Sequence, residues 1–200
     1  MKLKYAGISP YARKALVVMH EAGIADRIRL DVVNMREEPQ SILPYNPLAK
    51  VPALVLDDGT AIFDSPVICE YLDAEFGGRR LLPASGPERW RALTRQALAD
   101  GILDAALLVR QERLRPAELQ SKAFIAQQLG KVYAGLDRLE EEAPGFGALD
   151  LGLVAAGCAC GYLPLRLREI AEQRARWPRL HAWFDEISKR PSFAKTVPVL

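Results

Sequence analysis

The stretch PALVLDDGTAIFDSPVICEYL, residues 52–72, contains two short apolar segments, a tight turn and the start of a helix. Segments 53–56 and 60–63 flank Asp57-Asp58-Gly59, and an Asp-Gly pair favours the turn of a β-hairpin. Ser65-Pro66 has the pattern of a helix start, a capping residue followed by proline, and apolar residues then recur at helical spacing. The stretch therefore predicts an antiparallel hairpin followed directly by a helix.

Upstream of this stretch the sequence predicts a β-α-β unit. Alternation at Leu3 and Tyr5 indicates a first strand, and Ser9-Pro10 indicates the start of a helix. A second, half-buried strand is expected over 27–33, where three apolar residues alternate with polar ones and would form the buried face (Ile28, Leu30 and Val32). The connection 34–50 contains three prolines and is expected to hold at most a short helix. The order β-α-β, connection, β-β-α predicts a small thioredoxin-like α/β layer.

The second half of the chain has helical patterns without strand signals. Its best-defined helix is expected from Ala117 to Glu141, where apolar residues recur every three or four positions and should face a bundle core (Ile125, Leu129, Val132, Leu136 and Leu139). Asp150 is placed to cap a buried helix that Pro164 kinks or ends. A last amphipathic helix is expected over 180–187.

The predicted fold class is α/β plus all-α, an N-terminal thioredoxin-like domain followed by an all-helical bundle domain. We expect the first domain at residues 1–78, a linker at 79–87 and the helical domain at 88–200. A chain of 200 residues, half of them apolar, is long enough to bury a core in each part.

Composition excludes several classes of function. Twenty-seven basic against 25 acidic residues leave a net charge of +2, which gives no electrostatic case for nucleic acid or an anionic membrane. Three cysteines and two histidines argue against a disulfide framework and a metal centre, and indicate a reducing, cytoplasmic compartment. The first residues lack the apolar run of a signal peptide, and the uncharged stretch 151–165 is too short for a membrane helix.

Ser9, between the first strand and the first helix, is the first candidate for chemistry. Free N–H groups and the positive end of the helix dipole favour an anion at a helix N-terminus, so a thiolate beside Ser9 would be stabilised. A serine before proline is also explained as a simple cap, which stabilises a helix by about 1 kcal/mol. Spacing alone leaves both interpretations open.

The second candidate is Lys50-Val51-Pro52, immediately before the hairpin. X-Pro bonds are those that can be cis, and a cis bond here would turn the N–H and C=O of Val51 outward to pair with a peptide-like ligand. Lys50 would then be available for a carboxylate. The alternative is that Pro52 merely begins a strand and Lys50 is a solvated charge.

Asp64 and Ser65, at the second helix start, form the third candidate. The hydroxyl and N–H groups at Ser65 suit a carboxylate, and the Asp64 carboxylate suits an ammonium group. The pair could therefore hold an α-amino-acid head group. A helix cap at Ser65 is a sufficient alternative explanation.

Three motifs together resemble the N-terminal signatures of cytosolic glutathione S-transferases. They are Ser9-Pro10-Tyr11-Ala12-Arg13, Asn46-Pro47-Leu48-Ala49-Lys50-Val51-Pro52 and Asp64-Ser65-Pro66-Val67-Ile68-Cys69-Glu70-Tyr71-Leu72. The helical half is similar in length, and residues 178–193 resemble the closing helix pattern of the family, so the resemblance covers nearly the whole chain. The serine in the first motif is typical of serine-type, bacterial-like members. The resemblance implies a homodimer that acts in detoxification.

The resemblance also implies a role for each matching residue. Ser9 would donate a hydrogen bond to the glutathione sulfur. Lys50 would meet the glycyl carboxylate, and Val51, before Pro52, would pair through its backbone with the cysteinyl unit. Asp64 and Ser65 would hold the γ-glutamyl head group. These roles agree with the chemistry inferred from the residues, because glutathione has a carboxylate at each end and one ammonium.

The implied reaction is attack of the activated glutathione thiolate on a small apolar electrophile, with no cofactor beyond glutathione and no metal. Tyr11 is a second candidate for contact with the sulfur. The stretch Ser9 to Ala12 has the shape of a glutaredoxin motif with both cysteines replaced, which excludes a dithiol mechanism at this site. A glutathione-dependent peroxidase or isomerase, and a non-catalytic binding module with the same fold, remain alternatives.

The start of the buried helix departs from the family pattern. Family members often place Ser or Thr there, with Asp three residues later, whereas this chain has Asp150 and Leu153. We therefore expect the cap to be kept and the reciprocal half of the capping box to be absent.

Overall fold

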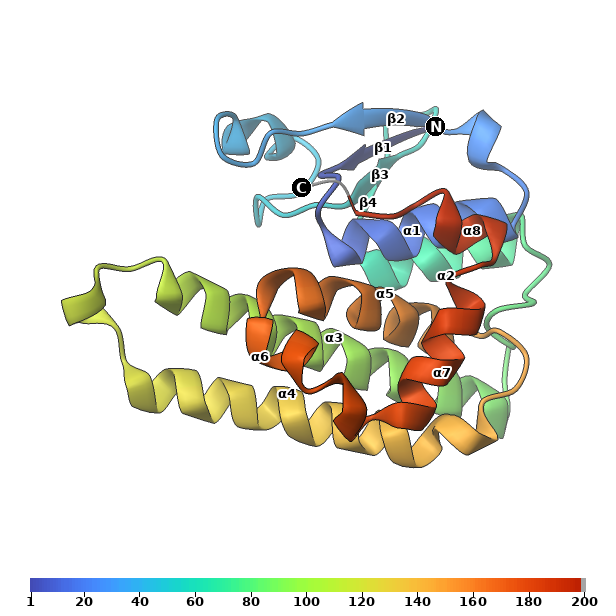
Figure 1. The fold of residues 1–200 in the computed structure, drawn as a ribbon. Helices are drawn as coiled ribbons and strands as arrows, with labels where there is room; N and C mark the ends of the chain where they lie inside the picture. The colour runs from blue at the N-terminus through green and yellow to red at the C-terminus, as the bar shows by residue number, and fades with distance from the viewer. Residues whose placement is uncertain (199–200) are drawn as a thin grey trace. The chain divides into compact units, whose positions relative to one another are not determined.

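The computed structural model describes residues 1–198, and the chain divides into two compact units (Figure 1). The first comprises Met1–Ala92 and the chain from Arg190 onward, and the second comprises Leu93–Lys189. The strands are β1 (Lys2–Tyr5), β2 (Arg29–Val32), β3 (Ala53–Val55) and β4 (Ala61–Ile62), and the helices are α1 (Pro10–Glu21), α2 (Ser65–Glu75), α3 (Pro87–Arg113), α4 (Lys122–Glu142), α5 (Leu151–Arg166), α6 (Arg168–Glu172), α7 (Pro178–Ile187) and α8 (Pro191–Ala194). The predicted fold class is confirmed. The exact domain boundaries at residues 78 and 88 stay a prediction.

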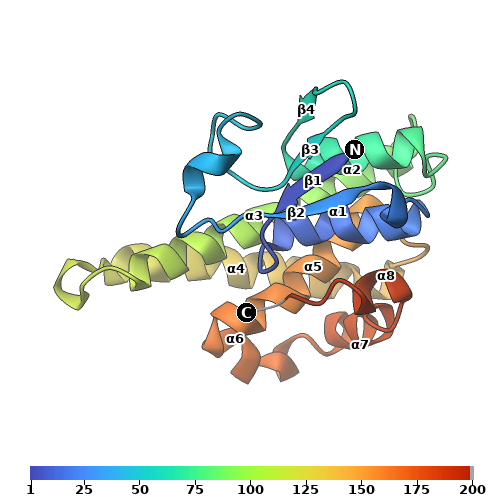
Figure 2. The same cartoon turned by 90° about the horizontal axis from the view of Figure 1, so that it is seen from above.

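The four strands of the first unit form one mixed sheet in the order β2-β1-β3-β4. β1 runs parallel to β2 and antiparallel to β3, and β3 pairs with β4 in the predicted hairpin. Its turn places Gly59 at a φ of 88°, a conformation that glycine adopts without strain. Leu3 of β1 and Leu54 of β3 are fully buried, and α1 and α2 cover one face of the sheet (Figures 1 and 2).

The strand expected over 27–33 is shorter in the structure, where β2 is Arg29–Val32, and its expected buried face is wrong for two of three residues. Ile28 is buried, but Leu30 is 46% exposed and Val32 is 67% exposed. The reason is the position of β2 at the edge of the sheet, where β1 is its one neighbouring strand. Alternation in the sequence predicts a strand correctly, but whether a helix covers its apolar side depends on the strand order.

The end of the chain returns to the first unit and packs along α1. Glu21, in the last turn of α1, accepts hydrogen bonds from Arg190 Nη2 (2.9 Å) and Ser192 Oγ (2.5 Å). In the first half of α1, Arg13 Nη2 donates to the carbonyl of Phe193 (3.3 Å), whose side chain is fully buried. α8 is therefore bound to α1 near both ends of that helix.

The helices of the second unit enclose an apolar core that includes Val132, Leu136 and Leu139 of α4, as the periodicity predicted. α4 itself begins at Lys122 rather than Ala117, because the chain leaves the short turn Ala117–Leu119 extended and Ser121 then caps the helix through the N–H of Phe124. Asp150 caps α5 as expected.

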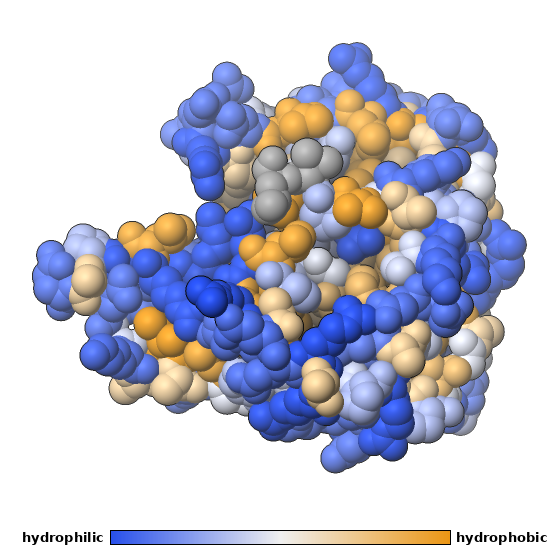
Figure 3. Space-filling view, in the orientation of Figure 1, coloured by the Kyte–Doolittle hydropathy of each residue, from blue (hydrophilic) through white to orange (hydrophobic). Residues whose placement is uncertain are grey.

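Hydrophilic and apolar residues are interspersed on the face seen in Figure 3. Among residues 1–198 no helix combines the length and apolar character needed to cross a membrane. Over the same residues no three His, Cys, Asp or Glu side chains gather closely enough to hold a metal ion.

Candidate functional site

The register of the sheet brings the three candidate motifs to one edge. Lys4, near the end of β1, pairs with Ala53 at the start of β3, and Ile62 at the end of β4 pairs with Leu54. The chain leaves β1 toward Ser9, enters β3 from Val51 and leaves β4 toward Asp64. The beginnings of α1 and α2 therefore lie at the same edge of the sheet (Figure 2), and the register places the Val51–Pro52 bond at that edge as well.

Ser9 is the N-cap of α1. Its Oγ accepts a hydrogen bond from the N–H of Ala12 at 3.2 Å, and its backbone is extended, with φ of −72° and ψ of 120°. Pro10 follows at the first helical position, as predicted. An Oγ that accepts from the helix keeps its own hydrogen for donation to a second partner. The structural and the chemical interpretations of Ser9 are therefore compatible with each other.

The Val51–Pro52 peptide bond is cis. Pro52 is buried, Val51 is half-buried and Lys50 is exposed. Val51 lies just before the strand ladder, and within residues 1–198 its N–H and C=O make no hydrogen bond to the rest of the chain. An unpaired backbone unit beside a strand is a position at which an extended peptide can pair.

The loop before Val51 is closed by Asn46, a residue to which the sequence patterns assigned no role. Asn46 is 1% exposed, and its side chain bonds both the N–H of Leu48 and the carbonyl of Lys50, each at 3.0 Å. Ala49 within this loop has a φ of 51°, which is uncommon for a residue other than glycine. No sequence pattern indicates the burial of Asn46, which lies between half-buried Tyr45 and exposed Pro47.

At the second helix start the expected cap is at the wrong residue. Asp64 is the N-cap of α2, and Ser65 is the first helical residue, with 2% of its surface exposed. The side chain of Asp64 makes no capping hydrogen bond and is exposed. The Phe63–Asp64 peptide bond is cis, which no sequence pattern indicated. Capping therefore does not explain either Asp64 or Ser65.

Other candidate residues lie in varied surroundings. Tyr11 is half-buried in the first turn of α1, with its ring centroid 5.8 Å from the ammonium of Lys14. Cys69, Cys158 and Cys160 are buried and free of disulfides. Burial, together with Cys158, raises the pKa of the Cys160 thiol to about 12, so this thiol is inert at neutral pH.

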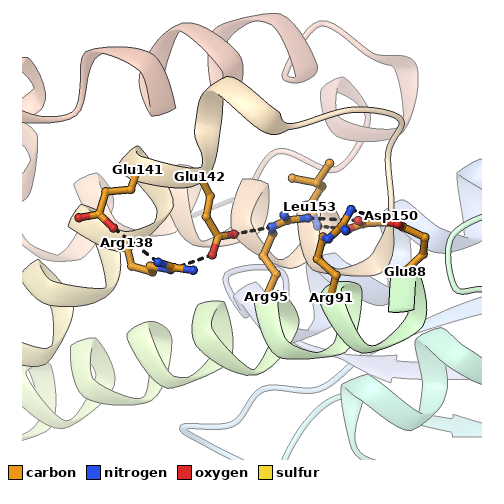
Figure 4. A network of polar contacts seen from close by, with 8 residues as sticks. All are labelled: Glu88, Arg91, Arg95, Arg138, Glu141, Glu142, Asp150 and Leu153. Carbon is orange, nitrogen blue, oxygen red and sulfur yellow. Dashed lines mark hydrogen bonds and ion pairs between the residues drawn. The ribbon is translucent and has the colours of Figure 1, made fainter. Parts of the chain in front are cut away.

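Arg95 of α3 forms ion pairs inside the second unit. It is 7% exposed and pairs with Glu142 (3.1 Å) and with Asp150 (3.2 Å), as Figure 4 shows. Its guanidinium lies 4.8 Å from the ring centroid of Phe146. Asp150 also accepts the N–H of Leu153 at 2.7 Å. The first half of the capping box is therefore present, and Arg95 contacts its carboxylate from another helix.

Comparison with known proteins agrees with this geometry. Residues 8–75 match the family model of the glutathione S-transferase N-terminal domain. The uncharacterized GST-like protein YibF of Escherichia coli (strain K12) is 34% identical over 206 residues, which cover 99% of this chain and 98% of that protein.

Solved structures are also similar. A glutathione transferase family member from Pseudomonas fluorescens Pf-5, with bound glutathione, is 39% identical with a TM-score of 0.92 and covers 100% of this chain and 99% of its own. A structure of a family member from the same organism with bound S-(propanoic acid)-glutathione matches at 39% identity and a TM-score of 0.90, over 100% of both chains. Because the sequence relative and the structures match along essentially the entire chain, this protein belongs to the glutathione S-transferase family.

Proposed function

We propose that this chain is a glutathione transferase that activates the glutathione thiol beside Ser9 for attack on a small apolar electrophile. The observation that carries the proposal is the convergence of Ser9, Val51 and Asp64 at one edge of the sheet. Support also comes from a relative, 39% identical, that was solved with glutathione bound.

Each part of glutathione would have a chemically matched partner at this edge. The unpaired N–H and C=O of Val51 suit the cysteinyl peptide unit, and the exposed ammonium of Lys50 suits the glycyl carboxylate. At α2, the Asp64 carboxylate is not used for capping and suits the γ-glutamyl ammonium, while Ser65 lies at the helix N-terminus that favours the carboxylate. Extended in this way, the tripeptide would place its sulfur toward α1.

The start of α1 leaves the Ser9 hydroxyl as the main hydrogen-bond donor for thiol activation. Pro10 has no N–H, and the N–H of Ala12 already bonds Ser9 Oγ, so α1 offers fewer backbone donors than an ordinary helix N-terminus. The Ser9 hydroxyl would therefore supply the main hydrogen bond to the sulfur, with the helix dipole as background. Lowering the pKa of a thiol from about 8.5 by about two units requires roughly 2.7 kcal/mol, which these two effects can supply together.

In the reaction, the thiolate sulfur would form a bond to the electrophilic carbon while the leaving group departs with its bonding electrons. Ser9 would keep its proton and act as a hydrogen-bond donor throughout. A peroxidase or isomerase would use the same thiolate. Conjugation is favoured here because a relative, 39% identical, was solved with an S-substituted glutathione.

We further propose a cytoplasmic homodimer, with residues 1–78 holding glutathione and residues 88–200, after the linker 79–87, shaping the pocket for the electrophile. Light scattering of the purified protein measures the oligomeric state directly. A monomer at micromolar concentration would contradict the dimer without affecting the assignment of the glutathione site.

The test of the proposed function is equilibrium binding of glutathione together with conjugation of an activated aryl halide. Asp64→Asn should weaken glutathione binding by about tenfold, because a charge-assisted hydrogen bond is lost. The matched control is Asp26→Asn, which removes an exposed acid in the turn Ala25–Arg27 at the opposite edge of the sheet. Absence of glutathione binding and of conjugation in the wild-type protein would refute the proposal, whereas binding without conjugation would favour the binding module.

A further inference from the structure

Asn46 is a buried polar side chain in a loop that is mostly exposed or half-buried. It is 1% exposed, while its neighbours Pro47 and Leu48 are exposed. Burial of an amide is costly unless its donors and acceptors are bonded, so its hydrogen bonds identify what the side chain does.

The two side-chain bonds of Asn46 serve different purposes. Oδ1 accepts from the N–H of Leu48 at 3.0 Å, a local turn that aspartate or serine could also make. Nδ2 donates to the carbonyl of Lys50 at 3.0 Å, and this bond requires an amide donor. Because the N–H of Leu48 must face an acceptor, the orientation of the amide is fixed by the network.

The carbonyl of Lys50 and the N–H of Val51 belong to the same peptide unit. A peptide unit is planar and rigid, so a hydrogen bond that fixes the direction of its carbonyl also fixes the direction of its N–H. A hydrogen bond at the carbonyl also polarises the unit and strengthens the N–H as a donor. Asn46 therefore acts on Val51 through one rigid group.

We propose that Asn46 is a positioning residue for glutathione: through the carbonyl of Lys50 it aims the N–H of Val51 at the cysteinyl unit of the tripeptide. This inference rests on the proposed function, because it assigns a supporting residue to the same site. Asn46 itself is expected to make no contact with the reacting sulfur.

The test compares Asn46→Asp with Asn34→Asp. Asn34 makes the same kind of local turn, since its Oδ1 accepts from the N–H groups of Arg36 and Glu37, and aspartate can keep those bonds. Asn46→Asp should weaken equilibrium binding of glutathione by about tenfold, because the donor to Lys50 is lost and the introduced carboxylate repels that carbonyl. Turnover at saturating glutathione should stay within about twofold, as should the affinity of Asn34→Asp.

The pH dependence of affinity separates positioning from general loosening of the loop. When the introduced carboxyl is protonated it can again donate to Lys50, and burial raises the pKa of such a group. The affinity of Asn46→Asp relative to wild type should therefore recover as the pH falls from 7 toward 5. Asn46→Ala, which removes both bonds without adding a charge, should bind weakly at both pH values.

The outcomes separate this inference from the proposed function. If wild type and Asn34→Asp bind glutathione and Asn46→Asp binds equally well, the positioning role is overturned while the proposed function stands. It is also overturned if turnover falls with unchanged affinity, or if both Asn46 variants fail to fold, since the amide would then serve the fold alone. Failure of the wild-type protein to bind glutathione would overturn both.

Discussion

Ser9 and Ser121 occupy equivalent positions in two helices and provide a matched pair of substitutions. Each is an N-cap whose Oγ accepts a hydrogen bond at 3.2 Å from the N–H three residues later. Ser9→Ala and Ser121→Ala should therefore each lower the free energy of unfolding by about 1 kcal/mol. Only Ser9→Ala should change the chemistry, because Ser9 lies at the edge of the sheet shared with Val51 and Asp64.

The expected chemical effect of Ser9→Ala follows from the lost donor. A hydrogen bond to a charged group contributes about 1.5–3 kcal/mol, which corresponds to about one to two pKa units for the bound thiol. With a rise of about 1.5 units from about 6.5, the thiolate population at pH 6 falls by about 25-fold. A more basic thiolate is also more nucleophilic, which offsets about fivefold of that loss. Turnover at pH 6 should therefore fall by about fivefold, whereas at pH 8.5, where most of the bound thiol is ionised in both proteins, the variant should turn over at least as fast as wild type.

Two assays measure these effects. The ultraviolet absorbance of the bound thiolate gives the thiol pKa, and conjugation at saturating glutathione between pH 6 and 8.5 gives turnover. Denaturant unfolding of both variants measures the capping contribution separately. The reasoning is refuted if Ser9→Ala leaves the acid limb of the turnover profile where it is in wild type, or if Ser121→Ala shifts that limb equally.

Two further predictions concern the helical unit. Glu140→Gln should lower the free energy of unfolding at pH 7 by about 1 kcal/mol, since the Glu140 carboxylate accepts hydrogen bonds from the first turn of α7. Burial raises the pKa of this carboxyl, but those hydrogen bonds and the guanidinium of Arg179 outweigh burial and lower the pKa from its ordinary value of 4.5. The carboxylate therefore stabilises the folded protein above pH 4.5, and this stabilisation is lost on acidification. Urea unfolding should show that the advantage of wild type over Glu140→Gln shrinks below pH 4.5, and an advantage that grows there would contradict the prediction. Gly135→Ala should destabilise the protein by about 1–3 kcal/mol, because the added methyl group would overlap the side chain of Ile102. The methyl group of Gly130→Ala meets open space, so this variant should be more stable than wild type by up to about 1 kcal/mol. Thermal unfolding measures both effects, and equal shifts of the two midpoints would show that the overlap at Gly135 is relieved.

The features that the sequence predicted correctly depend on contacts between near neighbours. The cap at Ser9, the turn at Asp57-Asp58-Gly59 and the cap at Asp150 each involve residues within about four positions of one another. Such bonds form whenever the local backbone has the right conformation, so residue type and spacing suffice to predict them. The separate motifs of the candidate site were recognisable for the same reason, because each is a strand end or a helix start, but their meeting at one edge depends on the register of the sheet.

The features that the sequence failed to predict depend on distant parts of the chain. Leu30 and Val32 are exposed because β2 lies at the sheet edge, which is decided by the order of all four strands. The return of the chain to α1 depends on Glu21 meeting Arg190, and no local pattern relates those two residues. Alternation and helical spacing describe one element at a time, so they contain no information about which elements become neighbours.

Arg95 shows how a distant residue can complete a local motif. From the sequence, Leu153 in place of an acid left the cap at Asp150 without its reciprocal partner. In the structure the carboxylate of Asp150 accepts from both Leu153 and Arg95, and Arg95 also pairs with Glu142 at the end of α4. The carboxylate of Asp150, beside a helix N-terminus, is stabilised further by a buried guanidinium that also pairs with a second carboxylate. Arg95 of α3, held by Glu142 of α4, thus stabilises the start of α5. An incomplete capping box in this family member therefore does not indicate an unstable helix start.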